Sequence, residues 1–212
     1  LNELQGLELI RLSSVEPQLF NDKIINTLPL IPKLCPHYHI PLQCGADSGL
    51  KRMRRHYTST TINQLIIKIC ERIPYPAIGM DVITGFPGET EEEHNQTCEF
   101  LRSLPLAYLH IFTFSKRKGT PAFDFPNQIS KTIKNRRANE LSQISRELTS
   151  AYTKSLMENN IPLRGIVEKN TNGYCEFLSD HYVRVRFSGN FQPGDFVQVP
   201  SQEAQIKMKN EE

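Results

Sequence analysis

The chain has 212 residues, with 25 Lys and Arg against 23 Asp and Glu, and 38% of its residues are hydrophobic. This composition is that of a globular protein and excludes an intrinsically disordered chain. The formal net charge of +2 also excludes a protein that is basic throughout, so a polyanionic partner would have to bind at local patches. One such patch lies between Thr113 and Arg137, where seven basic residues accompany a single acid, Asp124.

The cysteines are few and far apart in the sequence. Their odd number and wide spacing predict the reduced thiols of a cytoplasmic protein rather than a disulfide framework. The same spacing excludes a zinc ribbon or an iron-sulfur loop within the chain, because such sites draw three or four thiolates from a tight loop. No apolar run approaches the roughly 18 residues needed to cross a bilayer, so no membrane is expected as a partner. The five cysteines are Cys35, Cys44, Cys70, Cys98 and Cys175.

Strand and helix patterns alternate along the first 114 residues. Apolar runs predict strands at residues 7–12, 38–42, 77–83 and 108–114. Between them the periodicity predicts helices at residues 21–28, 59–73 and 90–104. The last of these opens with a capping box of Thr90 and Glu93. This alternation predicts parallel βαβ units, in which ligands bind at the C-terminal ends of the strands.

The pattern changes after residue 130. A long helix is capped by Ser130, carries an apolar face that includes Leu141 and Ile144, and ends near residue 160. Short strands then follow at residues 163–168, 174–178, 182–187 and 195–199, separated by glycine turns. Turns at that spacing predict a small β-barrel. The predicted organisation is a first domain over residues 1–161, a small barrel over residues 162–200 and a flexible tail over residues 201–212.

The run DVITGFPGET, residues 81–90, is the strongest local signal. A strand enters a turn with Gly85 and Gly88 and then a capped helix, whose N-terminus favours negative charge. Such a turn lets the backbone approach a ligand closely, although the glycines could equally serve the turn geometry alone. Asp81 is expected near the C-terminal end of its strand, where residues of parallel barrels are commonly functional.

A second group of polar residues lies between residues 37 and 58. Gln43, at the end of a predicted strand, suits ribose hydroxyls or an amino-acid group. The cations that could meet a carboxylate or phosphate are Lys51, Arg52, Arg54 and Arg55, and for the first two a solvated helix face is favoured.

Two histidines on one predicted strand raise the question of a metal. His37 and His39 point the same way, but no third ligand lies near them in the sequence. A packed or hydrogen-bonded pair is therefore favoured, and no metal site is predicted.

The run SKRKGTP, residues 115–121, follows the last predicted strand of the first domain. Basic residues beside a Gly-Thr-Pro turn at the C-terminal end of a strand suit a phosphate backbone at the mouth of a site. A surface loop that needs charge only for solubility fits this segment equally well.

Taken in order, these motifs resemble the methylthiotransferases of the radical S-adenosylmethionine superfamily. The resemblance rests on RLSSVEP (residues 11–17), HIPLQ with MRRHYT (39–43 and 53–58), DVITGFPGET (81–90) and SKRKGTP (115–121). It implies an α/β fold, the C-terminal half of a partial (β/α) barrel, followed by the small RNA-binding TRAM barrel of that family. It also implies insertion of sulfur and a methyl group into a C–H bond, with S-adenosylmethionine and 4Fe-4S clusters as cofactors.

The motifs further resemble one branch of the family. SSVEP, MRR and SKR-x-GTP are similar to the branch that modifies threonylcarbamoyladenosine next to the anticodon in tRNA. The isopentenyladenosine branch and the branch that acts on a ribosomal protein have other runs at these places, and neither pattern is present. Cys44 and Phe114 stand where the family more usually has Ser and Tyr. The implied partners are the tRNA anticodon stem-loop and S-adenosylmethionine, not DNA.

The resemblance also implies two sets of site residues. Those expected on the S-adenosylmethionine side are Ser14, Glu16, Gln43, Arg55, Asp81 and Gly85. Those expected to face tRNA are Lys116, Arg117, Lys118, Lys169, Arg184 and Arg186. The small barrel is not basic overall, so its RNA role depends on the resemblance and on Arg184 and Arg186, which share one strand face. Among its aromatic residues Tyr174, Phe177 and Tyr182 are candidates for stacking on bases, with a core position favoured for Phe177.

The sequence lacks the Cys-x-x-x-Cys-x-x-Cys run that holds the radical-generating cluster in this family. The expected interpretation is a C-terminal fragment of an enzyme, inactive alone, with no catalytic residue of its own and with the cluster ligands in a missing N-terminal part. A half barrel would also leave an open strand edge. Two alternatives remain open: an RNA-binding remnant without catalysis, and a methylthiotransferase that acts on isopentenyladenosine.

Overall fold

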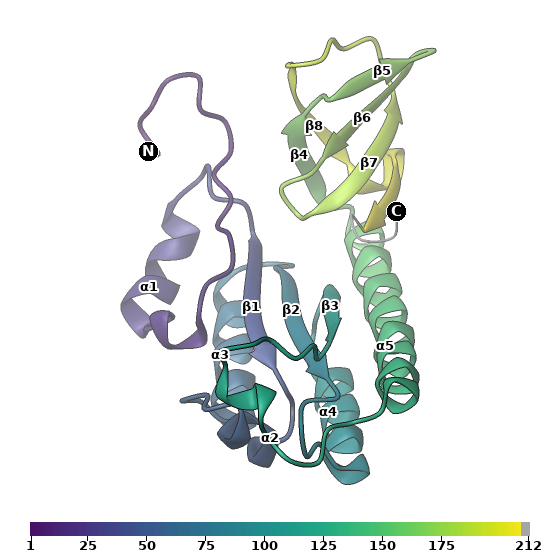
Figure 1. Ribbon diagram of the computed structural model, residues 1–212. Coiled ribbons are helices and arrows are strands. Elements are labelled where there is room, and N and C mark those ends of the chain that lie inside the picture. Colours follow the sequence, from purple (N-terminus) through teal and green to yellow (C-terminus); the bar gives the residue numbers. More distant parts are fainter. Residues whose placement is uncertain (209–212) are drawn as a thin grey trace.

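Three parallel strands form the centre of the first part of the molecule (Figure 1). The computed structural model describes residues 1–208. The strands β1 (His37–Gln43), β2 (Ala77–Thr84) and β3 (Tyr108–Thr113) pair in the order β1-β2-β3. Because the chain returns through helices between them, all three run in the same direction. This confirms the expected α/β class with a parallel sheet.

Two amphipathic helices, α3 (Ser59–Arg72) and α4 (Glu91–Ser103), cover one face of this sheet. Helix α4 begins at the predicted capping box of Thr90 and Glu93, and α3 is capped by Thr58, whose hydroxyl accepts from the amide of Thr61. Since side chains alternate along a strand, every second residue packs against the helices. These buried residues are Tyr38, Ile40, Leu42, Ile78, Met80 and Val82.

The other alternate residues point to the opposite side of the sheet, which we call the polar face. It is defined by His37, His39, Asp81, Tyr108 and His110. The register places Asp81 opposite His110 on the neighbouring strand. His39 and Tyr108 are instead in register with Gly79, two residues before Asp81 on β2, so the polar side chains occupy two adjacent levels of the sheet.

Residues 7–12 do not form the expected strand. Ile10 makes a single parallel bridge with Leu34, because residues 32–33 opposite form a turn and β1 begins only at His37. Further along, the Val15 amide donates to the carbonyl of His39, so this segment runs beside β1. The short elements of this part are η1 (Pro17–Leu19), α1 (Asp22–Thr27), η2 (Leu28–Leu30), α2 (Asp47–Arg52) and η3 (Pro121–Phe123).

The long helix α5 (Lys131–Glu158) runs along the outer edge of β3 and leads to the second part of the molecule (Figure 1). Its predicted cap is present, since the Ser130 hydroxyl accepts from the amide of Ile133. Ser145 accepts from the Leu109 amide at 3.0 Å, and Thr149 donates to the Ala107 carbonyl at 2.8 Å. Helix α5 thus covers the edge of β3 at its N-terminal end only, and the following residues up to Phe112 line an open groove beside the helix.

Antiparallel strands form a small β-domain after α5. A two-stranded sheet pairs β4 (Pro162–Ile166) with β8 (Phe196–Pro200). A four-stranded sheet has the order β5-β6-β7-β9, and its core includes Leu163, Phe177 and Val185. Its strands are β5 (Lys169–Thr171), β6 (Tyr174–Leu178), β7 (Val183–Ser188) and β9 (Gln205–Met208).

The strand predicted at residues 163–168 corresponds to β4, which ends at Ile166, whereas the separate strand β5 of the other sheet was not predicted. One expectation for this part was wrong. The segment after Pro200, expected as a flexible tail, contains η4 (Ser201–Glu203) and then β9, which pairs with β7. Ile206 and Met208 turn inward from β9, so this strand contributes to the core. Residues 209–212 lie outside the described residues.

The small β-domain packs against the N-terminal ends of β1 and β3 through Tyr182. The backbone of Tyr182 is left-handed, with φ of 60°. Its ring stacks on His37 at 4.2 Å and on Tyr108 at 5.1 Å between centroids, and the Arg11 guanidinium lies over it at 5.2 Å. The side chain is therefore part of a shared core between the two sheets.

An ion pair lies beside this contact. Arg164 Nε is 2.7 Å from Asp180 Oδ2, and a second nitrogen of Arg164 donates to the carbonyl of Pro32. Burial alone would raise the pKa of Asp180, but hydrogen bonds from His181 and Arg164 outweigh burial and lower it. The carboxylate is thus ionised at neutral pH, and Arg164 ties the two parts of the molecule together.

Candidate functional site

The turn after β2 has the geometry that its glycines suggest. Gly85 and Gly88 both have positive φ, at 74° and 77°. The Gly85 amide donates to Glu89 Oε2 at 2.6 Å, which closes the turn. A Cβ on Gly85 would collide with the side chain of Lys134, whose ammonium donates to the Phe114 carbonyl. The turn and a protein neighbour are therefore sufficient reasons for glycine at position 85.

A buried ion pair holds this turn to α5. Arg137 Nη1 lies 2.6 Å from Glu89 Oε2, and the two side chains are 4% and 5% exposed. The neighbouring Arg136 pairs with Glu91 at the surface, and hydrogen bonds from Arg136 and Arg137 lower the pKa of Glu91 to about 2. At least these two cations of the basic patch are thus committed to acids of the protein itself.

Residues expected on the cofactor side gather near the C-terminal end of β1. Gln43 ends the strand with φ of 72°, where the register with β2 shifts by one residue. Glu16 and Arg55 form an ion pair at 3.6 Å with both side chains partly exposed. Ser14 is exposed in the segment beside β1. The structure therefore brings Glu16 and Arg55 together, from segments that are 39 positions apart in the sequence.

A solvated helix face was favoured for Arg52, and the structure shows instead that its side chain is paired with an acid. Its guanidinium binds both carboxylate oxygens of Glu93, with Nη1 3.1 Å from Oε1, and Ser48 donates to the same carboxylate. Lys51 beside it is exposed, as expected. The pair links α2 to the first turn of α4 and so supports the 85–90 turn from the other side.

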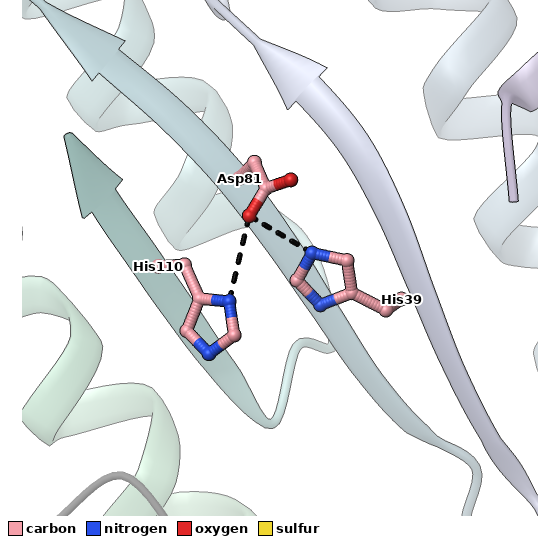
Figure 2. A group of neighbouring side chains, drawn as sticks. All are labelled: His39, Asp81 and His110. Carbon is pink, nitrogen blue, oxygen red and sulfur yellow. Dashed lines mark ion pairs between the residues drawn. The ribbon is translucent and has the colours of Figure 1, made fainter. Parts of the chain in front are cut away.

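Three side chains from three strands meet on the polar face (Figure 2). His39 Nε2 lies 2.9 Å from Asp81 Oδ1, and His110 Nδ1 lies 3.4 Å from the same oxygen. Burial alone would raise the pKa of Asp81, but the hydrogen bonds with His110 and His39 hold it well below its usual range. The result is an ionised carboxylate between two imidazoles, at the middle of the sheet.

A tyrosine connects the two histidines of β1. The Tyr108 hydroxyl lies 2.8 Å from His37 Nε2 and 3.1 Å from His39 Nδ1, and burial raises its pKa so that it keeps its proton. The expected packed or hydrogen-bonded pair is therefore present, joined through Tyr108. No third ligand lies near these histidines in the sequence, but the structure places Asp81 and His110, from the neighbouring strands, beside His39.

The basic loop after β3 is exposed at Lys116, Arg117 and Lys118. The Arg117 carbonyl accepts from the amide and the hydroxyl of Thr120, and the Lys116 ammonium lies 5.5 Å from the centre of the Phe123 ring. The loop thus has a defined turn that presents its cations at the C-terminal end of the sheet.

The basic residues expected on the small β-domain share one side of the four-stranded sheet. Lys169, Arg184 and Arg186 line a shallow groove of about 320 Å³ together with acids and amides. Arg184 pairs with Glu168, and Arg186 lies 3.7 Å from Glu176. The positive charge of this groove is therefore partly balanced by neighbouring carboxylates of the same domain.

The three aromatic candidates of this domain have different environments. Tyr174 is 43% exposed, and the guanidinium of Arg186 lies 4.6 Å from its ring centre. Phe177 is fully buried, as favoured. Tyr182 packs against His37 and Tyr108, so its ring is not available for stacking on a base. Only Tyr174 of these three remains suited to a contact with RNA.

The cysteines are dispersed within residues 1–208. All five are free. Burial raises the pKa of Cys35, Cys44, Cys70 and Cys98. No three of them come together as metal ligands in this part of the chain. Within the same residues, none of the helices has the length and apolar character of a membrane span.

Comparison with known proteins identifies relatives over most of this chain, although no family model matches it. It is 36% identical over 190 residues to the threonylcarbamoyladenosine tRNA methylthiotransferase MtaB of Bacillus subtilis, covering 88% of this chain and 42% of that protein. It is 42% identical over 142 residues to a tRNA-2-methylthio-N(6)-dimethylallyladenosine synthase of Arthrobacter sp., covering 67% of this chain and 27% of that enzyme. The corresponding enzyme of Clostridium tetani is 34% identical over 192 residues, with coverage of 89% and 42%. The chain spans less than half the length of these relatives.

A solved structure supports the same grouping at the level of fold. Coproporphyrinogen III oxidase (HemN) of Escherichia coli, a radical SAM enzyme, superimposes with a TM-score of 0.53 at 11% identity, over 86% of this chain and 46% of that one. Sequence and fold agree with the motifs described above. The chain therefore belongs to the family of the radical S-adenosylmethionine methylthiotransferases.

Proposed function

We propose that the chain is part of a cytoplasmic tRNA-modifying enzyme that methylthiolates threonylcarbamoyladenosine next to the anticodon. The observation that carries the proposal is the 36% identity with the B. subtilis enzyme over 88% of the chain. The runs RLSSVEP, MRR and SKRKGTP support the same branch. In this proposal the anticodon stem-loop of tRNA is the macromolecular partner.

Dimethylallyladenosine is the second candidate substrate. It is favoured by the 42% identity over 142 residues with the Arthrobacter enzyme, and several other relatives carry the same name. The two substrates share an adenosine and differ in the group on its exocyclic nitrogen. An assay of the product separates them directly.

The described residues fit S-adenosylmethionine in part. Glu16 and Arg55 offer opposite charges that complement the ammonium and carboxylate of an amino-acid group, and the Gln43 amide suits ribose hydroxyls. Asp81 lies on the polar face, where its carboxylate contacts His39 and His110. Gly85 gives no support, because Lys134 fills the space beside it. When bound, the cofactor would supply a radical and a methyl group, and these side chains would hold and orient it.

The residues of this chain do not fit a 4Fe-4S cluster. Such a cluster needs several converging thiolates, whereas burial keeps the thiols of Cys35, Cys44 and Cys98 protonated and no three cysteines meet within residues 1–208. We propose that the cluster ligands belong to the part of the enzyme that precedes this chain, and that the chain alone is inactive.

The proposed function is tested by restoring a modified nucleoside. We expect the full-length enzyme to restore 2-methylthio-threonylcarbamoyladenosine in a bacterial strain that lacks it, measured by mass spectrometry of digested tRNA. Restoration of 2-methylthio-dimethylallyladenosine in a strain lacking that nucleoside would instead establish the second candidate. Restoration of neither, with the protein folded and bound to tRNA, would favour an RNA-binding role without catalysis.

The basic loop is expected to bind phosphates of the tRNA backbone. Replacing Lys116, Arg117 and Lys118 together by Ala should weaken binding of tRNA by the full-length enzyme. It should also reduce the slope of log affinity against log salt by about 0.7 to 0.9 per lost contact, because each contact releases a condensed counterion. The measurement is a salt titration of tRNA affinity.

A charge-preserving triple variant, Lys116→Arg, Arg117→Lys and Lys118→Arg, is the matched control and should keep the slope. A second comparison replaces Arg184 and Arg186 by Ala. It should change the slope less than the loop variant does, because both arginines already face acids of the protein. An unchanged slope in the loop variant would show that this loop only contributes solubility.

A further inference from the structure

We propose that His39, Asp81 and His110 bind one divalent transition-metal ion, of the class of Zn²⁺, Fe²⁺ or Co²⁺, on the polar face. Each residue comes from a different strand, and each offers one ligand atom to a common point (Figure 2). Two imidazoles and a carboxylate are a ligand set that such ions accept in proteins. This assignment gives Asp81 a role other than the cofactor contact that the family resemblance implies.

The distances between the ligand atoms are close to those that an ion requires. Ligands at about 2.0 to 2.1 Å from a tetrahedral ion lie about 3.4 Å from one another. Asp81 Oδ1 is 2.9 Å from His39 Nε2 and 3.4 Å from His110 Nδ1. All three ligand atoms lie within 4.8 Å of one another, so an ion would enter with shifts of the side chains rather than by a rearrangement of the strands.

The side chains that are hydrogen-bonded in series to His39 can adopt the protonation state that metal binding requires. A metal ion on His39 Nε2 leaves the hydrogen on Nδ1, which would donate to the Tyr108 oxygen 3.1 Å away. The Tyr108 hydroxyl would then donate to His37 Nε2, at 2.8 Å. Without an ion the chain of hydrogen bonds runs the other way and ends at Asp81. Both states keep the Tyr108 hydroxyl and the two imidazole nitrogens that face it hydrogen-bonded, and in the metal-bound state His37 carries its hydrogen on Nδ1.

The site is open on one side. The side chain of His39 is 8% exposed, whereas those of Asp81 and His110 are 21% and 34% exposed. Three protein ligands leave a fourth position for water or a substrate atom, as in catalytic rather than structural zinc sites. The second ring nitrogen of His110 points away from Asp81 (Figure 2).

A second group of the same kind, His94, Cys98 and Glu140 between α4 and α5, is the natural comparison. There a single nitrogen, His94 Nε2, contacts both Glu140 and Cys98, and burial raises the pKa of Cys98 to about 11. The protonated thiol is a poor ligand, and His94 is 1% exposed. We interpret this group as a hydrogen-bonded contact between two helices, which makes it a suitable control.

The test is a Co²⁺ titration of the 212-residue chain under reducing conditions, followed by visible absorption and calorimetry. We expect one equivalent to bind, with the spectrum of nitrogen and oxygen ligands and no thiolate charge-transfer band. Tyr108→Phe removes a hydrogen-bond partner of the ligand His39 and should lower the affinity for Co²⁺ by about 10- to 100-fold. His110→Ala removes a proposed ligand at a partly exposed position and should lower the affinity by more than that. Cys98→Ser should bind as the wild type does.

Circular dichroism of each variant shows that it is folded, and a rise in melting temperature with Co²⁺ in the wild type but not in His110→Ala provides a second readout. Absence of binding would overturn the proposal, and so would equal affinity in the wild type and His110→Ala. Loss of binding in Cys98→Ser would place the ion at the other group. In each of these cases the polar face would be a hydrogen-bonded network only.

Discussion

Arg137→Ala is expected to lower the free energy of unfolding by about 3 to 5 kcal/mol, because it leaves the buried Glu89 carboxylate without its ion-pair partner. The substitution also removes a hydrogen bond to the Glu89 carbonyl. Since Glu89 accepts from the Gly85 amide, the turn after β2 should loosen at the same time. Urea denaturation of the two proteins measures the difference.

The adjacent Arg136→Ala is the matched control. Arg136 carries the same charge one position earlier, but it is 47% exposed and pairs with Glu91 and Glu140 at the surface. Exposed pairs contribute about 0 to 1 kcal/mol, so this variant should remain close to the wild type. Equal losses in both variants would mean that Glu89 is solvated in the folded protein and that the pair is not buried.

Phe177→Ala is expected to destabilise the protein by about 3 to 5 kcal/mol, because it opens a cavity at the centre of the small β-domain. The ring packs edge-to-face on Phe187 and against the Cα of Gly165, where even a Cβ would collide with it. No cavity forms when Tyr174 on the same strand is replaced, so Tyr174→Ala should leave stability within about 0.5 kcal/mol.

The same pair of variants separates packing from RNA binding. If the exposed Tyr174 ring stacks on a base, its loss should weaken tRNA affinity by about 1 to 3 kcal/mol at constant salt. The measurement is tRNA affinity of the full-length enzyme, with thermal unfolding as the check on folding. A stable Tyr174→Ala protein with unchanged affinity would remove this face of β6 from the RNA surface.

Elements with a strong local signal were predictable from the sequence. The apolar stripe of α3, the capping box of α4 and the Ser130 cap of α5 each specify a helix through neighbouring residues. Residues 7–12 have an equally strong apolar pattern, but a strand also needs a partner of similar length, and the sequence does not reveal that residues 32–33 form a turn. The strand β9 was missed for the opposite reason. Its four residues alternate between polar and apolar, but the segment is so short that only its pairing with β7 identifies it.

Parts of the candidate site were predictable from local sequence, whereas contacts between distant residues were not. The glycines of the 85–88 turn predict that turn from the local sequence. The Glu89–Arg137 ion pair joins residues 48 positions apart, so no local pattern predicts it directly. One signal was available, because Arg137 lies four residues before Leu141 and seven before Ile144, on the apolar face of α5. For the meeting of Asp81 with His39 and His110, the register of the parallel strands is required, and no local pattern contains it.

The hydroxyls that α5 presents to β3 have a consequence for how the molecule behaves at high concentration. An exposed edge strand can recruit a strand from another molecule, because its backbone donors and acceptors are vacant. Here Ser145 occupies the donor of Leu109, and Thr149 occupies the acceptor of Ala107. An incoming strand would have to displace a 28-residue helix before it could pair at these positions. The helix therefore protects the N-terminal end of β3 against intermolecular sheet extension, although the sheet has only three strands.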